Sequence, residues 1–199
     1  MTLLEDVVID ETRSERGTPV LATARLMLRA PRRADVKAIA RLHGDKRIAE
    51  NTARIPHPYG VADAEQFVAA VNRREGEAIF VVTLGDKLIG ACGIDPCEGG
   101  AELGYWLGAA HWGRGYGTEA ARAAIDYAFE GLEHEALVAG ARVSNPASRR
   151  VLEKCGFQWT GVRLTRIRAI NSAAPADRFR LDRGLWASLK GWGPVRRVA

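Results

Sequence analysis

The chain has 199 residues, 47% of them hydrophobic, which is enough for one domain with a buried core. Its formal net charge is +5, which could suggest nucleic-acid binding. The arginines are scattered, however, and no basic run is interleaved with aromatic residues, so the sequence argues against a nucleic-acid surface. No window approaches the roughly 18 continuous apolar residues of a membrane span, and the polar, acidic N-terminus is unlike a signal peptide.

The N-terminal part of the chain divides into an arm and the start of a domain. Residues 1–20 carry many charges and little periodicity, which predicts a mobile arm before a single domain at 21–199, with Val7–Ile9 available as a short edge strand. Apolar residues then alternate in strands and recur every three or four positions in helices. They predict, in order, a strand at 25–29, a helix at 35–43 capped by Asp35, a loop at 51–60, a helix capped by Asp63, and a hairpin of strands at 78–84 and 88–94.

The most informative stretch runs from Gly100 to Phe129. Its first part alternates, which predicts a strand at 100–107, and its last part has helical spacing at 118–129. Alternation places Ala101, Leu103, Tyr105 and Leu107 on one face of the strand, and Glu102, Gly104 and Trp106 on the other. Between strand and helix lies Gly113-Arg114-Gly115-Tyr116-Gly117, called the glycine turn below. Glycines let the backbone point N–H groups into one concavity beside a helix N-terminus, a geometry suited to phosphate oxygens.

The C-terminal half continues with alternating strands and helices. A mostly apolar run at 136–143 predicts a buried strand. Asn145 is a strong N-cap and Pro146 a good first helical residue, so a helix to about Lys154 is expected, with Gly156 as its stop. The remaining segments predict strands at 157–164 and 178–185, a polar loop at 171–177 between them, and a helical turn at 186–192. This order gives an α+β layered sheet.

The glycine turn matches the known nucleotide-binding patterns only in part. It lacks the GK[ST] of a P-loop, but Gly115, Gly117 and Ala120 match the dinucleotide pattern G-x-G-x-x-A. A dinucleotide site wants an acidic residue at the end of the next strand, where this chain has Ser144-Asn145. A dinucleotide ligand is therefore disfavoured, whereas a purely structural glycine-rich turn stays open.

Two segments together carry a family resemblance: Trp112-Gly-Arg-Gly-Tyr-Gly-Thr-Glu-Ala120 and Asn145-Pro-Ala-Ser148-Arg-Arg-Val-Leu152-Glu-Lys-Cys-Gly156-Phe157. With the strand Glu102–Leu107 and the opening TARLMLRAPRRAD, they resemble the GNAT superfamily of N-acetyltransferases, and more narrowly its RimJ/RimL type. The resemblance covers roughly 23–186. It implies the GNAT fold, a mixed, mostly antiparallel sheet of about seven strands with helices on both faces.

The resemblance implies acetyl-CoA as co-substrate. Its pyrophosphate would lie on the N–H groups of residues 113–118, and its pantetheine arm would pair with the backbone of Tyr105–Leu107, where the family splays two central strands. Arg149, Arg150 and Lys154 would meet the outer phosphates or form a solvated helix face. The implied coenzyme-binding residues are Tyr105, Trp106, Leu107, Trp112, Gly113, Arg114, Gly115, Tyr116, Gly117, Thr118, Asn145 and Ser148.

Acetyl transfer needs a base for the amine and a proton for the departing thiolate. Glu102 is the candidate base, directly or through water; the competing interpretation is a carboxylate facing solvent or an arginine. Many superfamily members use a tyrosine acid where this chain has Leu152, so Ser148 is the candidate acid; the alternative is that Ser148 caps its own backbone.

The sequence says less about the acceptor, the oligomeric state and the location of the protein. The acceptor is expected to be a primary amine, a protein N-terminus or a small amine, read by loops at 48–63 and 164–177, with His57 as a candidate contact. A non-catalytic CoA-binding module is the alternative function, and a homodimer is compatible with the family. Three cysteines without CxxC spacing and four histidines without ligand spacing predict reduced thiols, a cytoplasmic location and no metal.

Overall fold

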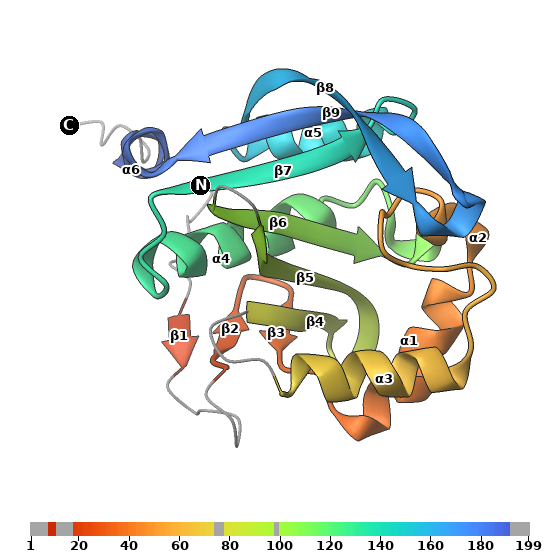
Figure 1. Cartoon of the computed structure of the whole chain (residues 1–199). Coiled ribbons are helices and arrows are strands. Elements are labelled where there is room, and N and C mark those ends of the chain that lie inside the picture. Colours follow the sequence, from red (N-terminus) through yellow and green to blue (C-terminus); the bar gives the residue numbers. More distant parts are fainter. Residues whose placement is uncertain (1–7, 11–17, 74–77, 98–99, 192–199) are drawn as a thin grey trace.

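The computed structural model describes residues 8–10, 18–73, 78–97 and 100–191. Within them nine strands form one sheet (Figure 1). The strands are β1 (Val8–Asp10), β2 (Val20–Ala22), β3 (Met27–Arg29), β4 (Ala78–Leu84), β5 (Lys87–Cys97), β6 (Gly100–Leu107), β7 (Ala136–Arg142), β8 (Gln158–Ile167) and β9 (Ser172–Asp182). The helices are α1 (Val36–His43), α2 (Lys46–Ala49), α3 (Val61–Val71), α4 (Tyr116–Glu130), α5 (Pro146–Lys154) and α6 (Arg183–Gly191), with short 3-10 turns at Arg33–Asp35, Ala109–His111 and Arg168–Ile170.

The sheet has the order β1-β2-β3-β4-β5-β6-β7-β9-β8, and only β6 and β7 pair in parallel among the described strands. The expected mixed, mostly antiparallel α+β sheet is therefore confirmed, although nine described strands replace the seven expected. The difference lies at the N-terminus, where β1 pairs with β2 as an edge strand. The rest of the expected mobile arm up to residue 17 lies outside the described residues.

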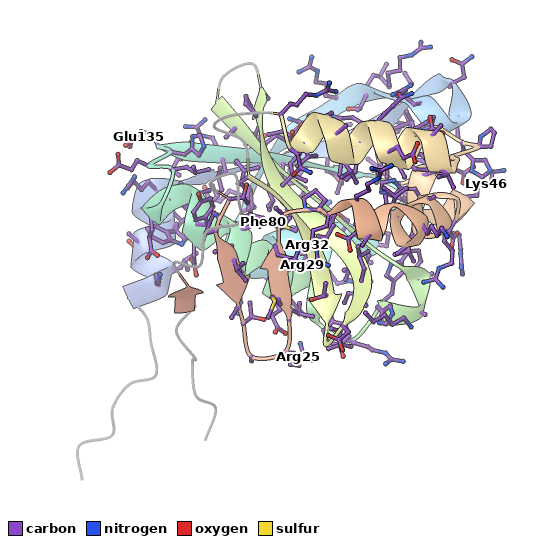
Figure 2. The ribbon with its side chains drawn as sticks, turned by 90° about the horizontal axis from the view of Figure 1, so that it is seen from below. Arg25, Arg29, Arg32, Lys46, Phe80 and Glu135 are labelled. Atoms are coloured by element: carbon purple, nitrogen blue, oxygen red, sulfur yellow. The ribbon has the colours of Figure 1, made fainter. Side chains whose placement is uncertain are left out.

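Helices cover both faces of the sheet. On β4, Phe80 and Val82 pack into a cluster with α4, whereas Val81 between them packs against α1 and α3. Successive side chains of a strand point to opposite faces, so these three residues place one helical layer on each side. Phe80 is fully buried and lies inside the molecule in Figure 2, with Lys46 and Glu135 at its periphery. Within the described residues, no helix is long and apolar enough to cross a membrane.

The centre of the sheet opens between its two parallel strands. The pairing of β6 with β7 covers Ala101–Leu103 against Leu137–Ala139, although β6 continues to Leu107 and β7 to Arg142. Figure 1 shows the two strands diverging beyond this point. The last four residues of β6 remain paired with β5 on their other edge. One edge of β6 is therefore available to a ligand, as the family resemblance implies.

The prediction of a polar loop at 171–177 is wrong. Residues 172–177 belong to β9, and the hairpin turns earlier, at Arg168–Asn171, where Asn171 has φ +47°. Alanine, proline and polar residues suggested a loop, but Ala174 and Ala176 are buried and pair with β8. Pairing with β8 and burial of these alanines override local propensity here.

The helices before the central strand differ from the prediction in three respects, although α1 follows Asp35 and ends at His43 as expected. α3 begins at Val61, so Asp63 is not its N-cap; instead its carboxylate accepts from Gly60 N at 2.8 Å. Asp35 does not cap α1 with its side chain, because it accepts from Arg32 N at 2.7 Å and pairs with Arg29 at 2.8 Å. The short helix α2 is not predicted from the sequence, since its four residues carry too little periodicity.

Candidate functional site

The glycine turn joins the end of β6 to α4. Gly113 and Gly115 have φ +73° and +81°, a region that side-chain-bearing residues rarely adopt, and Gly115 is the N-cap of α4. The helix begins at Tyr116, so the expected start at Thr118 is wrong and Gly117 lies inside the first turn. The first helical bond beyond the cap runs from Glu119 N to Gly115 O at 3.1 Å. The N–H groups of Tyr116, Gly117 and Thr118 are the first-turn amides, which an α-helix leaves without intrahelical partners.

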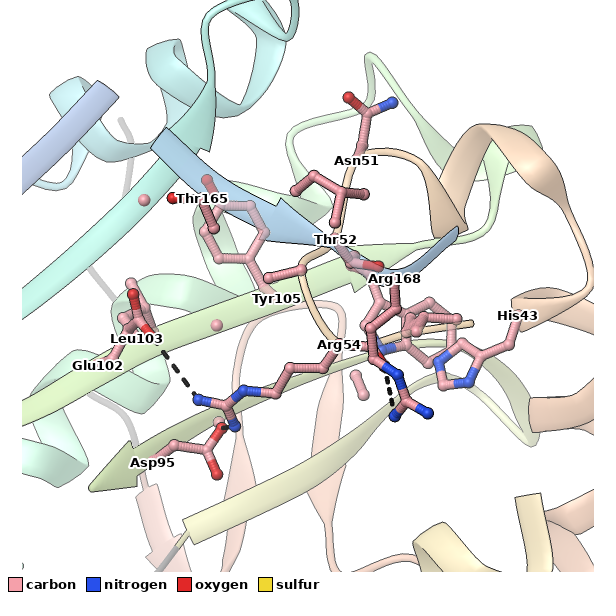
Figure 3. A pocket seen from close by; sticks show the side chains of 18 of the residues that line it. His43, Asn51, Thr52, Arg54, Asp95, Glu102, Leu103, Tyr105, Thr165 and Arg168 are labelled. Carbon is pink, nitrogen blue, oxygen red and sulfur yellow. Dashed lines mark hydrogen bonds and ion pairs between the residues drawn. The ribbon is translucent and has the colours of Figure 1, made fainter. Parts of the chain in front are cut away.

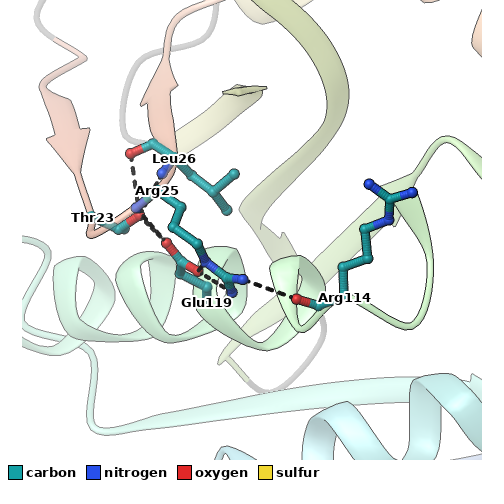
Figure 4. Close-up of polar contacts among 5 residues, drawn as sticks. All are labelled: Thr23, Arg25, Leu26, Arg114 and Glu119. Atoms are coloured by element: carbon teal, nitrogen blue, oxygen red, sulfur yellow. Dashed lines mark hydrogen bonds and ion pairs between the residues drawn. The ribbon is translucent and has the colours of Figure 1, made fainter. Parts of the chain in front are cut away.

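A clamp from the N-terminal segment holds this turn (Figure 4). Arg25 Nε donates to Glu119 Oε2 at 2.7 Å, and Arg25 Nη1 donates to the carbonyl oxygen of Arg114 at 3.1 Å. Thr23 Oγ1 donates to the other Glu119 oxygen at 2.6 Å. The clamp offsets the one acidic charge in the first turn of α4, next to the place where an anion would bind. The side chain of Arg114 extends away from the clamp.

Two predicted residues at the opening of the sheet have internal partners. Trp112 Nε1 donates to Leu107 O at 2.7 Å, so its indole N–H ties the glycine turn to the end of β6. Asn145 caps α5 as expected, with its Oδ1 accepting from Ser148 N at 3.1 Å. Both residues therefore shape the opening through contacts within the chain.

Tyr105 connects β6 to α5. Its hydroxyl lies 2.9 Å from Ser148 Oγ and donates to the Ser148 carbonyl oxygen at 2.9 Å. Burial raises the pKa of Tyr105, so this hydroxyl stays protonated at neutral pH. Leu152 is fully buried in the core one turn further along α5. The serine hydroxyl is thus oriented by a tyrosine from a strand far away in the sequence, a contact that no local motif predicts.

The side chain of Glu102 lines the central cavity and is also paired with two arginines, as Figure 3 shows for Arg54. Its Oε1 accepts from Arg178 Nη1 at 2.9 Å, and its Oε2 lies 3.6 Å from Arg54 Nη2. Arg54 in turn donates to Asp95 Oδ2 at 2.7 Å. The two interpretations of Glu102 are therefore not exclusive, because the carboxylate is both ion-paired and part of a cavity wall.

The central cavity has a volume of about 830 Å³ and is lined by both candidate catalytic residues, Glu102 and Ser148. Tyr105 and Trp106 of β6 also line it, together with residues of the 51–56 loop, α3, and the β8–β9 hairpin. Its lining includes neither His57 nor any residue of the glycine turn. The structure thus brings the candidate base and acid to one cavity and leaves His57 outside it.

His43 forms a buried aromatic corner of this cavity. Its ring lies 4.3 Å from that of Trp106 and 4.6 Å from that of Tyr59, and 2% of the residue is exposed. Burial lowers the pKa of His43 to about 4, so the ring is neutral at pH 7. Neither ring nitrogen has a hydrogen-bond partner among the described residues.

Four cavity residues, Arg54, Asp95, Arg178 and His43, are not predicted from the sequence. They come from four separate segments, and no local motif connects them. The sequence points to this region only through the expectation that the loops at 48–63 and 164–177 both contact the acceptor. The structure places parts of these two segments together, since Arg168 N donates to Ala53 O at 3.1 Å.

In the part of the chain that the structure describes, no group of three or more His, Cys, Asp or Glu side chains is placed to hold a metal ion.

Comparisons with known proteins identify the family. The family model of the acetyltransferase (GNAT) domain matches residues 25–158. Among curated proteins, the "Uncharacterized N-acetyltransferase p20" of Bacillus licheniformis is 32% identical over 150 residues, covering 71% of this chain and 84% of that protein. The ribosomal-protein-serine acetyltransferase of Escherichia coli strain K12 is 33% identical over 90 residues, 44% of this chain and 50% of that protein.

Solved structures share the fold. Spermidine N-acetyltransferase from Vibrio cholerae, in complex with CoA and spermine, has a TM-score of 0.72 at 22% identity, over 83% of this chain and 99% of that one. RimJ from Mycobacterium smegmatis, in complex with CoA-disulfide, has a TM-score of 0.70 at 19% identity, over 83% of this chain and 89% of that one. With its central strands opened beside a glycine turn, and with matches that cover most of its domain, this chain belongs to the GNAT family of N-acetyltransferases.

Proposed function

We propose that this enzyme binds acetyl-CoA at the opening between β6 and β7 and transfers the acetyl group to a primary amine in the central cavity, by direct attack in a ternary complex. The observation that carries this proposal is the placement of β6. Its residues Glu102 and Tyr105 line the cavity, its C-terminal half has one edge free of β7, and it leads into the glycine turn.

The residues present fit coenzyme A. The amides of Tyr116–Thr118 and the positive end of the α4 dipole suit a pyrophosphate. The open edge of Tyr105–Leu107 suits the amides of a pantetheine arm, which would add to the sheet as an extra strand. Because Trp112 already binds the Leu107 carbonyl, it supports this edge rather than binding the arm through its N–H. Acetyl-CoA would supply the activated thioester.

Glu102 is the proposed base, acting directly or through water. An α-amine with a pKa near ~7.8 is neutral in roughly one molecule in seven at pH 7, compared with roughly one in 2,500 for lysine. A base next to an α-amine therefore only needs to remove the proton that becomes acidic during attack. The arginines Arg54 and Arg178 hold the carboxylate in place at the cavity wall.

Ser148 is the proposed donor to the departing thiolate. Its Oγ would pass its own proton to the thiolate. The Tyr105 hydroxyl, 2.9 Å away and kept protonated by its raised pKa, could then turn its single proton from the Ser148 carbonyl oxygen to Oγ. Tyr105 is then a positioning residue that orients the serine from the strand side.

Calorimetric titration with acetyl-CoA, followed by thiol release on mixing with an amine panel, tests this function. The panel should contain peptides with ribosomal-protein N-termini, free amino acids and polyamines. We expect binding and thiol release with at least one class. No acetyl-CoA binding by the folded protein would refute the proposal; binding without release by any amine would favour a non-catalytic CoA-binding module.

A further inference from the structure

More positive than negative side chains line the central cavity. Six arginines line it, Arg54, Arg142, Arg163, Arg166, Arg168 and Arg178, against three carboxylates, Asp63, Asp95 and Glu102. Arg54 and Arg178 are paired with Asp95 and Glu102. The other four arginines form no ion pair with any carboxylate of the described residues. An excess of positive charge thus faces the space where an acceptor would bind.

Neutral oxygens hold three of these four arginines. Arg142 Nη1 donates to Glu50 O at 2.6 Å, Arg166 Nη2 to Asn171 Oδ1 at 2.7 Å, and Arg168 Nη1 to Arg54 O at 3.3 Å. Such contacts orient a guanidinium without offsetting its charge. In addition, Arg142 Nε is buried and has no hydrogen-bond partner among the described residues.

Arg163 differs from the other three. It is an exposed residue of β8 that lines the cavity, and no hydrogen bond or ion pair joins its side chain to another described residue. The backbone at Arg163 is held in place, because β8 pairs with β9 at this point, with Arg163 opposite Ala176. The tip of the hairpin is also tied to the 51–56 loop through Arg168 N and Ala53 O at 3.1 Å. Figure 3 shows Arg168 beside Arg54 on one wall of the cavity.

Three oriented arginines, together with Arg163, lack carboxylate partners among the described residues, and this favours an anionic ligand. The planar guanidinium offers paired donors that match a carboxylate or a phosphate, and it remains charged at any physiological pH. The same set disfavours a polycationic acceptor, because like charges repel.

We propose that the acceptor of this enzyme is an anionic amine: a primary amine that carries a carboxylate or phosphate group, bound by Arg163 together with Arg142, Arg166 and Arg168. This inference rests on the proposed function, since it names the substrate class of the same cavity. The amine lies toward Glu102, and the anionic group lies toward the hairpin.

Matched acceptors that differ only in charge test the proposal. One arm compares the amidated tripeptides Ala-Glu-Ala, Ala-Gln-Ala and Ala-Lys-Ala, and a second compares phosphoethanolamine with ethanolamine, so that the arms separate carboxylate from phosphate. We expect kcat/KM to be at least about tenfold higher for the anionic member of one arm, and this preference to shrink with added salt. Equal or better turnover of the neutral and cationic members would overturn the inference while leaving the acetyltransferase function intact.

The variant Arg163→Gln should reduce the preference for the anionic acceptor about tenfold, mainly through KM, and Arg163→Lys should restore part of it. Arg41→Gln is the matched control, because Arg41 is an exposed arginine of α1 outside the cavity and its loss changes the net charge equally. A preference that survives in Arg163→Gln, or that falls equally in Arg41→Gln, would contradict the proposal.

A binding measurement separates this inference from the proposed function. Calorimetry with the N-acetylated Ala-Glu-Ala amide, or with inorganic phosphate for the second arm, needs no turnover. We expect Arg163→Gln to bind the anionic probe about tenfold more weakly than the wild type does. Equal binding by both proteins would refute the anion site whether or not the enzyme acetylates any amine.

Discussion

The glycine turn and the central cavity would present different parts of the chain to a ligand. The turn offers backbone N–H groups from consecutive residues, 113–118, and depends on glycine φ angles of +73° and +81°. The cavity offers side chains from α1, the 51–56 loop, β5, β6, β7, α5 and the β8–β9 hairpin. Backbone groups bind the same ligand whatever the neighbouring side chains are, whereas side chains can be exchanged one at a time. The turn therefore suits a shared coenzyme, and the cavity suits an acceptor that differs between family members.

The ion pairs that hold the glycine turn in place differ from those that hold the cavity wall. One clamp, Arg25 with Glu119, secures the glycine turn. A chain of charges, from Asp95 through Arg54 to Glu102 and Arg178, secures the cavity. Removing one member of such a chain leaves its partners without compensation, so we expect substitutions in the cavity to have larger effects on catalysis than substitutions in the turn.

The largest effect is expected from Glu102→Gln. Loss of the proposed base should lower kcat about 100-fold or more, while the affinity for acetyl-CoA, which we propose depends on the turn, should stay within about twofold. Steady-state kinetics and calorimetry measure the two quantities. Asp182→Asn is the control, because Asp182 is also paired with an arginine, Arg180 at 2.6 Å, but does not line the cavity. An unchanged kcat in Glu102→Gln would remove the base assignment and leave the fold assignment untouched.

A second test concerns the stability of the cavity side. The unfolded chain binds a proton at His43 near the ordinary pKa of about 6.5, but the folded protein does so only near 4, so acidification favours unfolding. Between pH 7 and pH 5 this group should cost about 2 kcal/mol of unfolding free energy. Tyr59, which packs on the ring, has a pKa raised to about 12 by burial and stays neutral throughout.

Urea denaturation of the wild type and His43→Phe at both pH values measures this contribution. The phenylalanine variant should lose about 2 kcal/mol less stability on acidification than the wild type does. The comparison between proteins cancels the titration of carboxylates, which both share. An identical pH dependence would show that His43 is protonated within the folded protein at pH 5.

The smallest effect is expected from Gly115→Ala. An added Cβ would adopt an unfavourable φ of +81° and lie 3.3 Å from Arg25 Nη2, which should distort the turn and weaken acetyl-CoA binding about tenfold. Gly85→Ala is the matched control, since Gly85 has φ +56° with no atom within 4 Å of the added Cβ and lies in the β4–β5 turn. Both variants should lose about 1–2 kcal/mol of stability, but only Gly115→Ala should lose affinity. Equal affinities would mean that the turn is structural and does not bind the coenzyme.

Most secondary structure could be predicted because it depends on local patterns. The strand 100–107 and the helix capped by Asn145 appear with the expected start, since alternation and capping are properties of adjacent residues. Tertiary pairing explains the clearest failure: segment 172–177 has a loop-like composition but pairs with β8 along its length and with β7 at its last two residues.

The candidate site divides in the same way. Contiguous residues predict the glycine turn, and the family resemblance of two short segments nominates Glu102 and Ser148 as candidates. The Arg25–Glu119 clamp, the Tyr105–Ser148 contact and the arginine-rich cavity wall join residues that are distant along the chain. Whether two residues that are far apart in the sequence come into contact depends on the order of the strands and on where they diverge. Both of these arise from packing across the whole domain. The GNAT family and a candidate coenzyme turn could therefore be predicted from the linear sequence, whereas the charges that line the cavity depend on the fold.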